Sequence, residues 1–311
     1  FNAKTRRFRN FMGYQRNWLE DSGSDDSHGR ALWALGMILG RSTTPALHDM
    51  AGRVFQQSLL AILETSSPRA WAFALIGIHE YLKRFAGDRR VSQVQEELAG
   101  RLLSLYKDNQ REGWNWFEDK LTYCNASLSH AMLLCGESIP NPEMTNIGLE
   151  SLGWLADIQR SDTEGRHFVP IGSNGFYPRG GERARFDQQP VEAQAMVSTC
   201  LEAYRITGKK IWQMEARRAF EWFLGRNDLH LPVYDPTTGG CRDGLHPDRV
   251  NENQGAESTL AFLQSLLELR LAENIEESHE HSHNEQSPNK SISTPHVEPH
   301  PDSRKLALSS Q

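Results

Sequence analysis

Apolar residues recur at spacings of three and four, the period of an α-helix, over most of residues 26–270. The helical segments come in pairs. One member of each pair is apolar or small nearly all round, as a buried helix should be, and the next has a charged face opposite its apolar face. We therefore predict alternating inner and outer helices. The inner helices are expected at 26–40, 67–85, 125–136 and 190–207 and from about 253 onward, and the outer helices at 44–64, 89–108, 142–159 and 209–226.

The inner helices begin at intervals of about 42 to 65 residues, and such a recurring pair of helices is typical of a solenoid or a ring of hairpins. Three connections are long, at 110–123, 160–189 and 227–252, and each precedes an inner helix. Loops of this length in a compact domain usually carry function. The pattern predicts an all-α toroid of five to six helical hairpins, with an inner and an outer ring and the long loops on one face.

Composition limits the classes of partner. The net charge of −6 gives no general attraction to nucleic acid or to an anionic membrane. The longest apolar runs are far shorter than the roughly 20 residues of a membrane span, so none is predicted. The four cysteines lie far apart without a C-x-x-C pair, which argues against a zinc site or a disulfide framework and favours a reduced, cytoplasmic location.

The two ends of the chain differ in character. The chain begins FNAKTRRFRN, with neither an initiator Met nor an apolar signal core, and we expect it to be the C-terminal part of a longer protein. Residues 273–311 are rich in His, Pro, Ser and Glu and nearly free of large apolar side chains. Such a segment cannot bury enough surface to offset its ordering entropy, so we predict a globular domain over 1–272 and a disordered tail over 273–311.

Two of the predicted inner helices begin with unusual polar and aromatic residues. The first start contains Asp26, His28 and Arg30, although a helix needs only one cap. A buried Asp–Arg pair that joins two helices is the structural alternative. The loop before 125 is rich in aromatic residues, whose rings suit the C–H face of a sugar, while carboxylates and amides bind its hydroxyls. The alternative is a loop folded back as an apolar plug. The candidates in this loop are Trp114, Trp116, Asp119, Tyr123 and Asn125.

The last two inner helices share the pattern Q-x-x-E, in QPVEAQ and QGAEST. Capping explains this pattern weakly, because helix caps are preferentially Ser, Thr, Asp or Asn. In a ring, Glu192 and Glu257 are expected to point toward a shared central cavity. The polar neighbours that complete these two helix starts are Asp187, Gln189, Asn253 and Gln254.

Two alternating rings of helices with long loops on one face resemble the (α/α) toroid of the six-hairpin glycosidase superfamily, over residues 1–272. The segments EDSGSDDSHGRALWALG, WNWFEDKLTYCNA, RFDQQPVEAQAM and NENQGAEST are also similar, more weakly, to helical domains found C-terminal to bacterial glycosyltransferases of the retaining, two-Rossmann type. The first resemblance implies a carbohydrate-active domain with a saccharide ligand. The second implies a glycosyltransferase domain upstream in the same chain.

The leading hypothesis is a domain that makes or breaks a glycosidic bond with two carboxylates, one acid and one base or nucleophile. The candidate acids are Glu192 and Glu257, and the candidate bases are Asp26 and Asp187. Alternatives are a sugar epimerase using His28 and His130, a non-catalytic domain of a glycosyltransferase, and a structural scaffold. No metal-ligand set, phosphate loop or nucleophile elbow occurs, so no cofactor is expected.

Overall fold

The computed structural model describes residues 1–163 and 166–285, with side chains to residue 275. The chain divides into two compact units, Phe1–Ala272 and Glu273–Gln311. The last helix continues to Glu285, into the segment predicted to be the tail. The rest of that segment, 286–311, lies outside the described residues.

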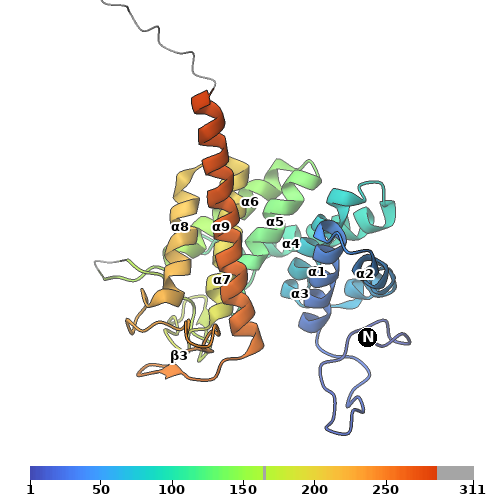
Figure 1. Cartoon of the computed structure of the whole chain (residues 1–311), viewed down its shortest axis with the longest axis horizontal. Helices are drawn as coiled ribbons and strands as arrows, with labels where there is room; N and C mark the ends of the chain where they lie inside the picture. Colours follow the sequence, from blue (N-terminus) through green and yellow to red (C-terminus); the bar gives the residue numbers. More distant parts are fainter. Residues whose placement is uncertain (164–165, 286–311) are drawn as a thin grey trace, which may run out of the picture. The chain divides into compact units, whose positions relative to one another are not determined.

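The described residues form nine α-helices and two short 3₁₀-helices, η1 (Leu59–Glu64) and η2 (Trp222–Leu224) (Figure 1). Each helix predicted from the apolar spacing is present, and its start lies within a few residues of the expected position. The α-helices are α1 (Asp25–Arg41), α2 (Pro45–Ser58), α3 (Pro68–Arg84), α4 (Arg89–Asn109), α5 (Ala126–Ser138), α6 (Pro142–Ile158), α7 (Pro190–Thr207), α8 (Lys210–Glu221) and α9 (Ala256–Glu285).

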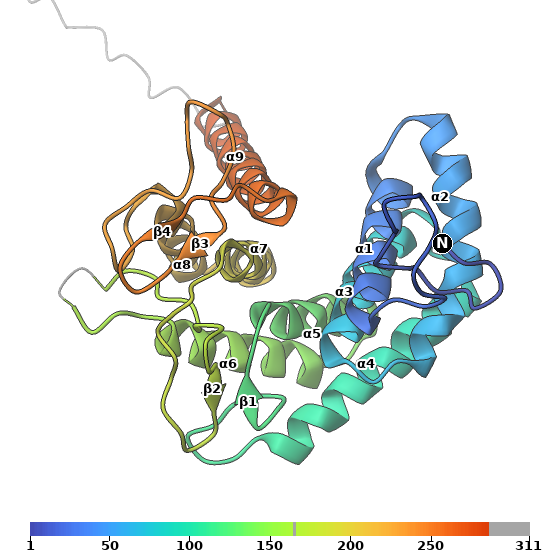
Figure 2. The ribbon, with the colours of Figure 1, turned by 90° about the horizontal axis from the view of Figure 1, so that it is seen from below.

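The helices form two layers. In the inner layer α1 packs on α3, α3 on α5 and α5 on α7, and each of these helices also packs on the outer helix that follows it. Figure 2 shows α1, α3, α5, α7 and α9 along the inside of the arc and α2, α4, α6 and α8 along the outside. The predicted all-α toroid with five inner helices is confirmed. Within the described residues, α9 is followed by no outer helix.

Glycine allows α1 and α3 to pack backbone against backbone. A Cβ atom added to Gly36 would lie 2.1 Å from the carbonyl oxygen of Gly77, and one added to Gly77 would lie 2.5 Å from that of Leu32. Cβ atoms do not approach backbone oxygens this closely, so only glycine fits at this crossing. The small residues that make the 26–40 segment apolar all round therefore set the distance between these two inner helices.

The three long loops are joined to one another at the N-terminal ends of the inner helices. Strand β1 (Lys120–Leu121) pairs antiparallel with β2 (Tyr177–Pro178), which ties the first loop to the second. Strand β3 (Gly244–Leu245) pairs with β4 (Val250–Asn251) within the third loop. A bridge from Gln188 to Leu245 ties the second loop to the third. The predicted clustering of long loops on one face is thus confirmed.

No helix in the part of the chain that the structure describes is both long enough and apolar enough to span a membrane.

Candidate functional site

Arg30, on the first two turns of α1, lies at the centre of a cluster contributed by four inner-helix segments. Its Nε donates to Asp26 Oδ2 at 3.0 Å, and its Nη2 lies 3.9 Å from Glu257 Oε2 at the start of α9. Nη2 also donates to Cys124 Sγ at 3.2 Å, and the guanidinium carbon lies 4.4 Å from the ring centre of Phe73 on α3. One cation therefore brings together two predicted site carboxylates from the two ends of the inner arc.

The two carboxylates are accessible and close together. The Asp26 side chain is 25% exposed and the Glu257 side chain is 65% exposed. Because Nε and Nη2 of a planar guanidinium are about 2.3 Å apart, the two contacting oxygens are at most about 9 Å apart. This upper limit admits both the separation of about 5–5.5 Å found in retaining glycosidases and most of the range of about 6.5–9.5 Å found in inverting ones.

Two aromatic side chains accompany this pair. The hydroxyl of half-buried Tyr123 donates to Asp26 Oδ1 at 2.9 Å, and burial together with Asp26 raises the pKa of this phenol. Half-buried Trp33 lies parallel to Phe73, with ring centres 5.8 Å apart. Sequence reasoning did not select Trp33. The sequence feature that could have identified Trp33 is its position one helical turn after Arg30 on the same inner helix.

Glu192 lies beneath this cluster rather than in an open cavity, contrary to the prediction. The residue is 3% exposed, and its two oxygens accept hydrogen bonds from the backbone N–H of Cys124 and from Asn125 Nδ2. Burial raises the pKa of Glu192 to about 7, although both hydrogen bonds act in the opposite direction. Glu192 therefore holds the turn before α5, in which Cys124 has a positive φ of 46°.

Arg69 and Asn125 complete this buried network. Arg69 is 3% exposed and pairs with Glu118 Oε2 at 2.6 Å, while its Nη2 donates to Asn125 Oδ1 at 3.1 Å. Its guanidinium also donates to the carbonyl oxygen of Tyr123. Asn125 is fully buried and fixed by these bonds, so the prediction that its amide binds a sugar is wrong. The network instead fixes the position of Tyr123.

The loop tryptophans are also buried, so the predicted sugar platform is wrong for them. Trp114 is 4% and Trp116 is 0% exposed, and their ring centres lie 5.0 and 5.9 Å from that of Trp154. The apolar plug, the alternative considered from the sequence, describes this loop. Asp119 is exposed, and its carbonyl oxygen accepts from the N–H of Arg179 at 2.7 Å where β1 meets β2.

The candidate histidines do not form a pair at the ring opening. His28 is fully buried, and its Nε2 lies 3.2 Å from the carbonyl oxygen of Ser58, at the end of the outer helix α2. Burial lowers the pKa of His28 to about 4. Burial also lowers the pKa of His130, on α5, which lies among Glu202, Glu80 and Lys83. The expectation that His28 binds substrate is therefore wrong, because this side chain faces the outer layer.

The polar residues before α7 and α9 mostly bind one another. Asp187 accepts from His246 Nδ1 at 2.8 Å, which joins two long loops, and its side chain is 39% exposed. Gln189 occupies the N-cap position of α7 without a side-chain cap bond.

Asn253 and Gln254 are used by the loop in front of α9. The Asn253 amide donates to Asp243, and Gln254 Oε1 accepts from Thr238 Oγ1 at 2.8 Å. Asp243 also accepts from the N–H of Gly255 at 2.8 Å. The two amides were expected to bind substrate, but these bonds direct them toward the protein's own loop.

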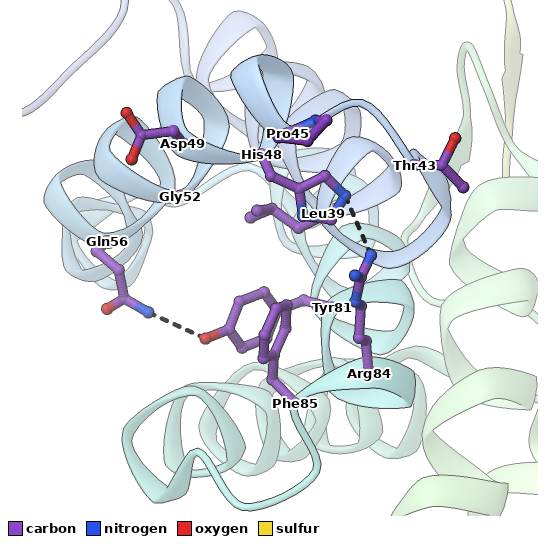
Figure 3. Close-up of a pocket in the computed structure, with 10 residues that line it drawn as sticks. All are labelled: Leu39, Thr43, Pro45, His48, Asp49, Gly52, Gln56, Tyr81, Arg84 and Phe85. Atoms are coloured by element: carbon purple, nitrogen blue, oxygen red, sulfur yellow. Dashed lines mark hydrogen bonds between the residues drawn. The ribbon is translucent and has the colours of Figure 1, made fainter.

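A cavity of about 500 Å³ lies at the opposite ends of α1 and α3, beside the outer helix α2 (Figure 3). Gln56 Nε2 lies 3.2 Å from the Tyr81 hydroxyl there, and Arg84 Nη1 lies 3.1 Å from His48 Nε2. This cavity contains none of the predicted site residues and is separate from the Arg30 cluster. Its lining consists of Leu39, Thr43, Pro45, His48, Asp49, Gly52, Gln56, Tyr81, Arg84 and Phe85.

The fold is similar to that of several solved carbohydrate-active enzymes. An unsaturated glucuronyl hydrolase specific for heparin superposes with a TM-score of 0.63 at 11% identity, covering 86% of this chain and 73% of that chain. A sugar epimerase from a ruminal bacterium gives a TM-score of 0.57 at 12% identity, covering 87% and 80%. A family 76 glycoside hydrolase (mannosidase) from Bacteroides thetaiotaomicron gives 0.55 at 9% identity, covering 88% and 80%.

These similarities establish the fold. No protein-family model matches the chain, and no curated protein sequence is similar to it. The predicted all-α toroid fold is shared by these structural neighbours, which are two hydrolases and an epimerase. At such low identity the chemistry has to be argued from this chain's own residues.

Proposed function

We propose that this domain binds a saccharide at the N-terminal ends of the inner helices and cleaves or forms a glycosidic bond there. The observation that carries the proposal is the placement of Asp26 and Glu257 on one guanidinium, that of Arg30, with a separation of at most about 9 Å. The fold of the sugar-active neighbours supports it.

The two carboxylates suit different roles. Asp26 is fixed by Arg30 and by the hydroxyl of Tyr123, as a base that aligns a water must be. Glu257 is more exposed and has only the longer contact to Arg30, so it can follow the leaving-group oxygen as general acid. The rings of Trp33 and Tyr123 would supply apolar surface for the sugar. Glu192, assigned a catalytic role from the sequence, becomes a positioning residue.

The test uses Asp26→Asn and Glu257→Gln, assayed for release of reducing sugar on a panel of oligosaccharides. Each variant should lose about 100-fold or more in kcat/KM, because an acid or base typically contributes that much. Asp248→Asn is the matched control, since among the described residues its exposed side chain pairs with neighbouring Arg249 in the third loop. Full activity in both variants, on a substrate that the wild type cleaves, would overturn the proposal.

A non-catalytic saccharide-binding domain is the second candidate. The observation that favours it is that Arg30 contacts both carboxylates, which gives them a purely structural use in holding α1 near α9. Under this reading a saccharide raises the melting temperature of the wild type without turnover, and Trp33→Ala removes the shift. An upstream glycosyltransferase domain in the full-length gene would favour this candidate. Epimerisation has no such support, because His28 faces the outer layer.

A further inference from the structure

A hairpin precedes α1 and lies outside the core. In this segment, residues 11–19, which we call the aromatic hairpin, Met12 forms an antiparallel bridge with Trp18. The N–H of Gly13 donates to the carbonyl of Asn17 at 2.7 Å, and the N–H of Leu19 donates to the carbonyl of Phe11 at 3.0 Å. Figure 1 shows this dark blue loop projecting beyond the start of α1. The hairpin has a defined backbone although little of it is buried.

The side chains of the aromatic hairpin are apolar and exposed. Single exposed apolar residues are ordinary, but a contiguous group of large ones marks a binding surface. Tyr14 at the tip is wholly exposed, and the other large residues expose between two fifths and two thirds of their surface. The group consists of Phe11, Met12, Tyr14, Trp18 and Leu19.

The segment up to the end of the hairpin is opposite in charge to the full chain, although Glu20, which follows it, accepts from the N–H of Phe11 at 3.2 Å. The full chain has a net charge of −6, yet residues 1–19 contain five basic residues and no acidic one. Two of these cations are paired, Arg7 with Asp25 at 2.7 Å and Arg9 with Asp21 at 3.4 Å. The remaining three are exposed and have no ion pair within the described residues; they are Lys4, Arg6 and Arg16.

The segment that directly precedes the hairpin is attached to the helical domain. Besides the Arg7–Asp25 pair, the N–H of Gly23 donates to the carbonyl of Phe8 at 2.7 Å, and Asn10 Nδ2 lies 3.2 Å from Ser24 Oγ. Ser24 is the N-cap of α1. A surface bound by the hairpin would therefore lie at the same end of α1 as Asp26.

We propose that the aromatic hairpin binds the interfacial region of an anionic lipid bilayer. Tyr and Trp prefer the headgroup level, and Phe11 and Leu19, which pair across the hairpin, can enter the acyl boundary. Unpaired Lys and Arg side chains are attracted to anionic headgroups. A neutral or acidic protein surface would not be attracted to them. The insertion is shallow and reversible, because one short hairpin buries little area. Membrane binding by the hairpin does not depend on the proposed function. If both hold, the saccharide site lies close to the membrane surface.

The experiment is flotation of the purified chain with two vesicle types, one of phosphatidylcholine and one containing about 30 mol % phosphatidylserine. The wild type should float with the anionic vesicles at low salt and be released as salt rises. Two double variants test the apolar side chains of the hairpin and the unpaired cations in and before it. Phe11→Ser with Tyr14→Ser, and Arg6→Glu with Arg16→Glu, should each reduce the bound fraction about tenfold or more.

The matched controls carry the same changes elsewhere. Ile211→Ser with Met214→Ser removes two exposed apolar residues from α8, and Arg53→Glu with Arg90→Glu reverses two exposed charges, one on α2 and one on α4. Both should bind the anionic vesicles like the wild type, with the circular dichroism of all variants unchanged. Absence of wild-type binding, or equal binding by wild type and hairpin variants, overturns the proposal. Equal wild-type binding to both vesicle types also overturns it, since the cations would then play no part.

Discussion

The starts of α7 and α9 share a sequence pattern and differ in structure. Each contains Q-x-x-E, with Gln189 and Glu192 at α7 and Gln254 and Glu257 at α9. Glu192 is 3% exposed and bonded on both oxygens, whereas the Glu257 side chain is 65% exposed with a single ion contact. The same spacing thus gives a buried structural carboxyl in one helix and an accessible one in the other.

The difference follows from position in the arc. Helix α7 packs against α5, α6 and α8, and the turn before α5 lies over its first residues. Helix α9 is the last inner helix and touches the start of α1 through the Arg30–Glu257 contact. A carboxylate on a helix with neighbours on both sides is buried and hydrogen-bonded within the protein. A carboxylate on α9, at the end of the arc, remains accessible to solvent. The position of each helix in the ring, which cannot be read from the sequence, determines whether its glutamate is buried or accessible.

The largest expected effect on stability comes from removing the buried carboxyl. Glu192→Ala leaves the N–H of Cys124 and the amide of Asn125 without an acceptor in a buried site. We expect the free energy of unfolding to fall by about 4 kcal/mol, because each buried unsatisfied donor costs on the order of 1–3 kcal/mol. Urea denaturation at pH 5 measures it. A loss below about 1 kcal/mol would mean that water reaches this site.

This contrast shows what a sequence can and cannot predict. The nine helices were predictable, because the 3.6-residue period and local caps such as Ser24 and Ser67 are encoded nearby. The structure brings Asp26, Arg30, Tyr123 and Glu257 together, and the sequence did not distinguish these candidates from the buried ones.

The remaining residues depend on contacts between distant segments. Arg69 lies in an apolar helix and donates a hydrogen bond to the carbonyl oxygen of Tyr123, in a loop 54 residues away. Trp114 and Trp116 are buried because Trp154 on α6 covers them. Whether an aromatic loop faces water or the core is decided by such partners, and residue type alone does not reveal it.

The pH dependence of stability is the next largest effect. The pKa of Glu192 is raised from 4.5 to about 7 by burial, so the folded state keeps its proton when the unfolded chain has lost it. Its stabilising contribution is complete below pH 4.5 and is lost as the pH rises to about 7, on the order of 3 kcal/mol. Glu192→Gln, which resembles the protonated acid, should remove this dependence.

The measurement is the free energy of unfolding at pH 5 and pH 8 for wild type and Glu192→Gln. Glu268 also has a raised pKa, to about 6, and contributes in the same direction in both proteins. The difference between the two proteins therefore isolates Glu192. A parallel pH profile for wild type and Glu192→Gln would contradict the assignment.

A smaller effect is expected at the cap of α9. The carboxylate of Asp243 accepts from the N–H of Gly255 and from Ser258 Oγ at 2.6 Å, so it serves the start of the helix from the preceding loop. Asp243→Ala should cost about 1–2 kcal/mol, the usual value of a lost N-cap. The reference is Asp248→Ala in the same loop, which should be neutral. If both variants unfold like the wild type, the start of α9 is held by other groups.

The smallest effect on stability is predicted for the carboxylate proposed to act in catalysis. Glu257→Ala removes a contact of 3.9 Å between an exposed carboxylate and a partly buried guanidinium, which is worth less than about 0.5 kcal/mol after solvent screening. Thermal unfolding should therefore coincide with that of the wild type, while Glu192→Ala unfolds early. If Glu257→Ala is also strongly destabilised, its contact with Arg30 holds α9 in place and the two helix starts do not differ in role. A near-neutral variant would show that Glu257 is not needed for folding. Its conformation could then be set by a bound ligand, whereas the buried Glu192 is held by the hydrogen bonds that stabilise the fold.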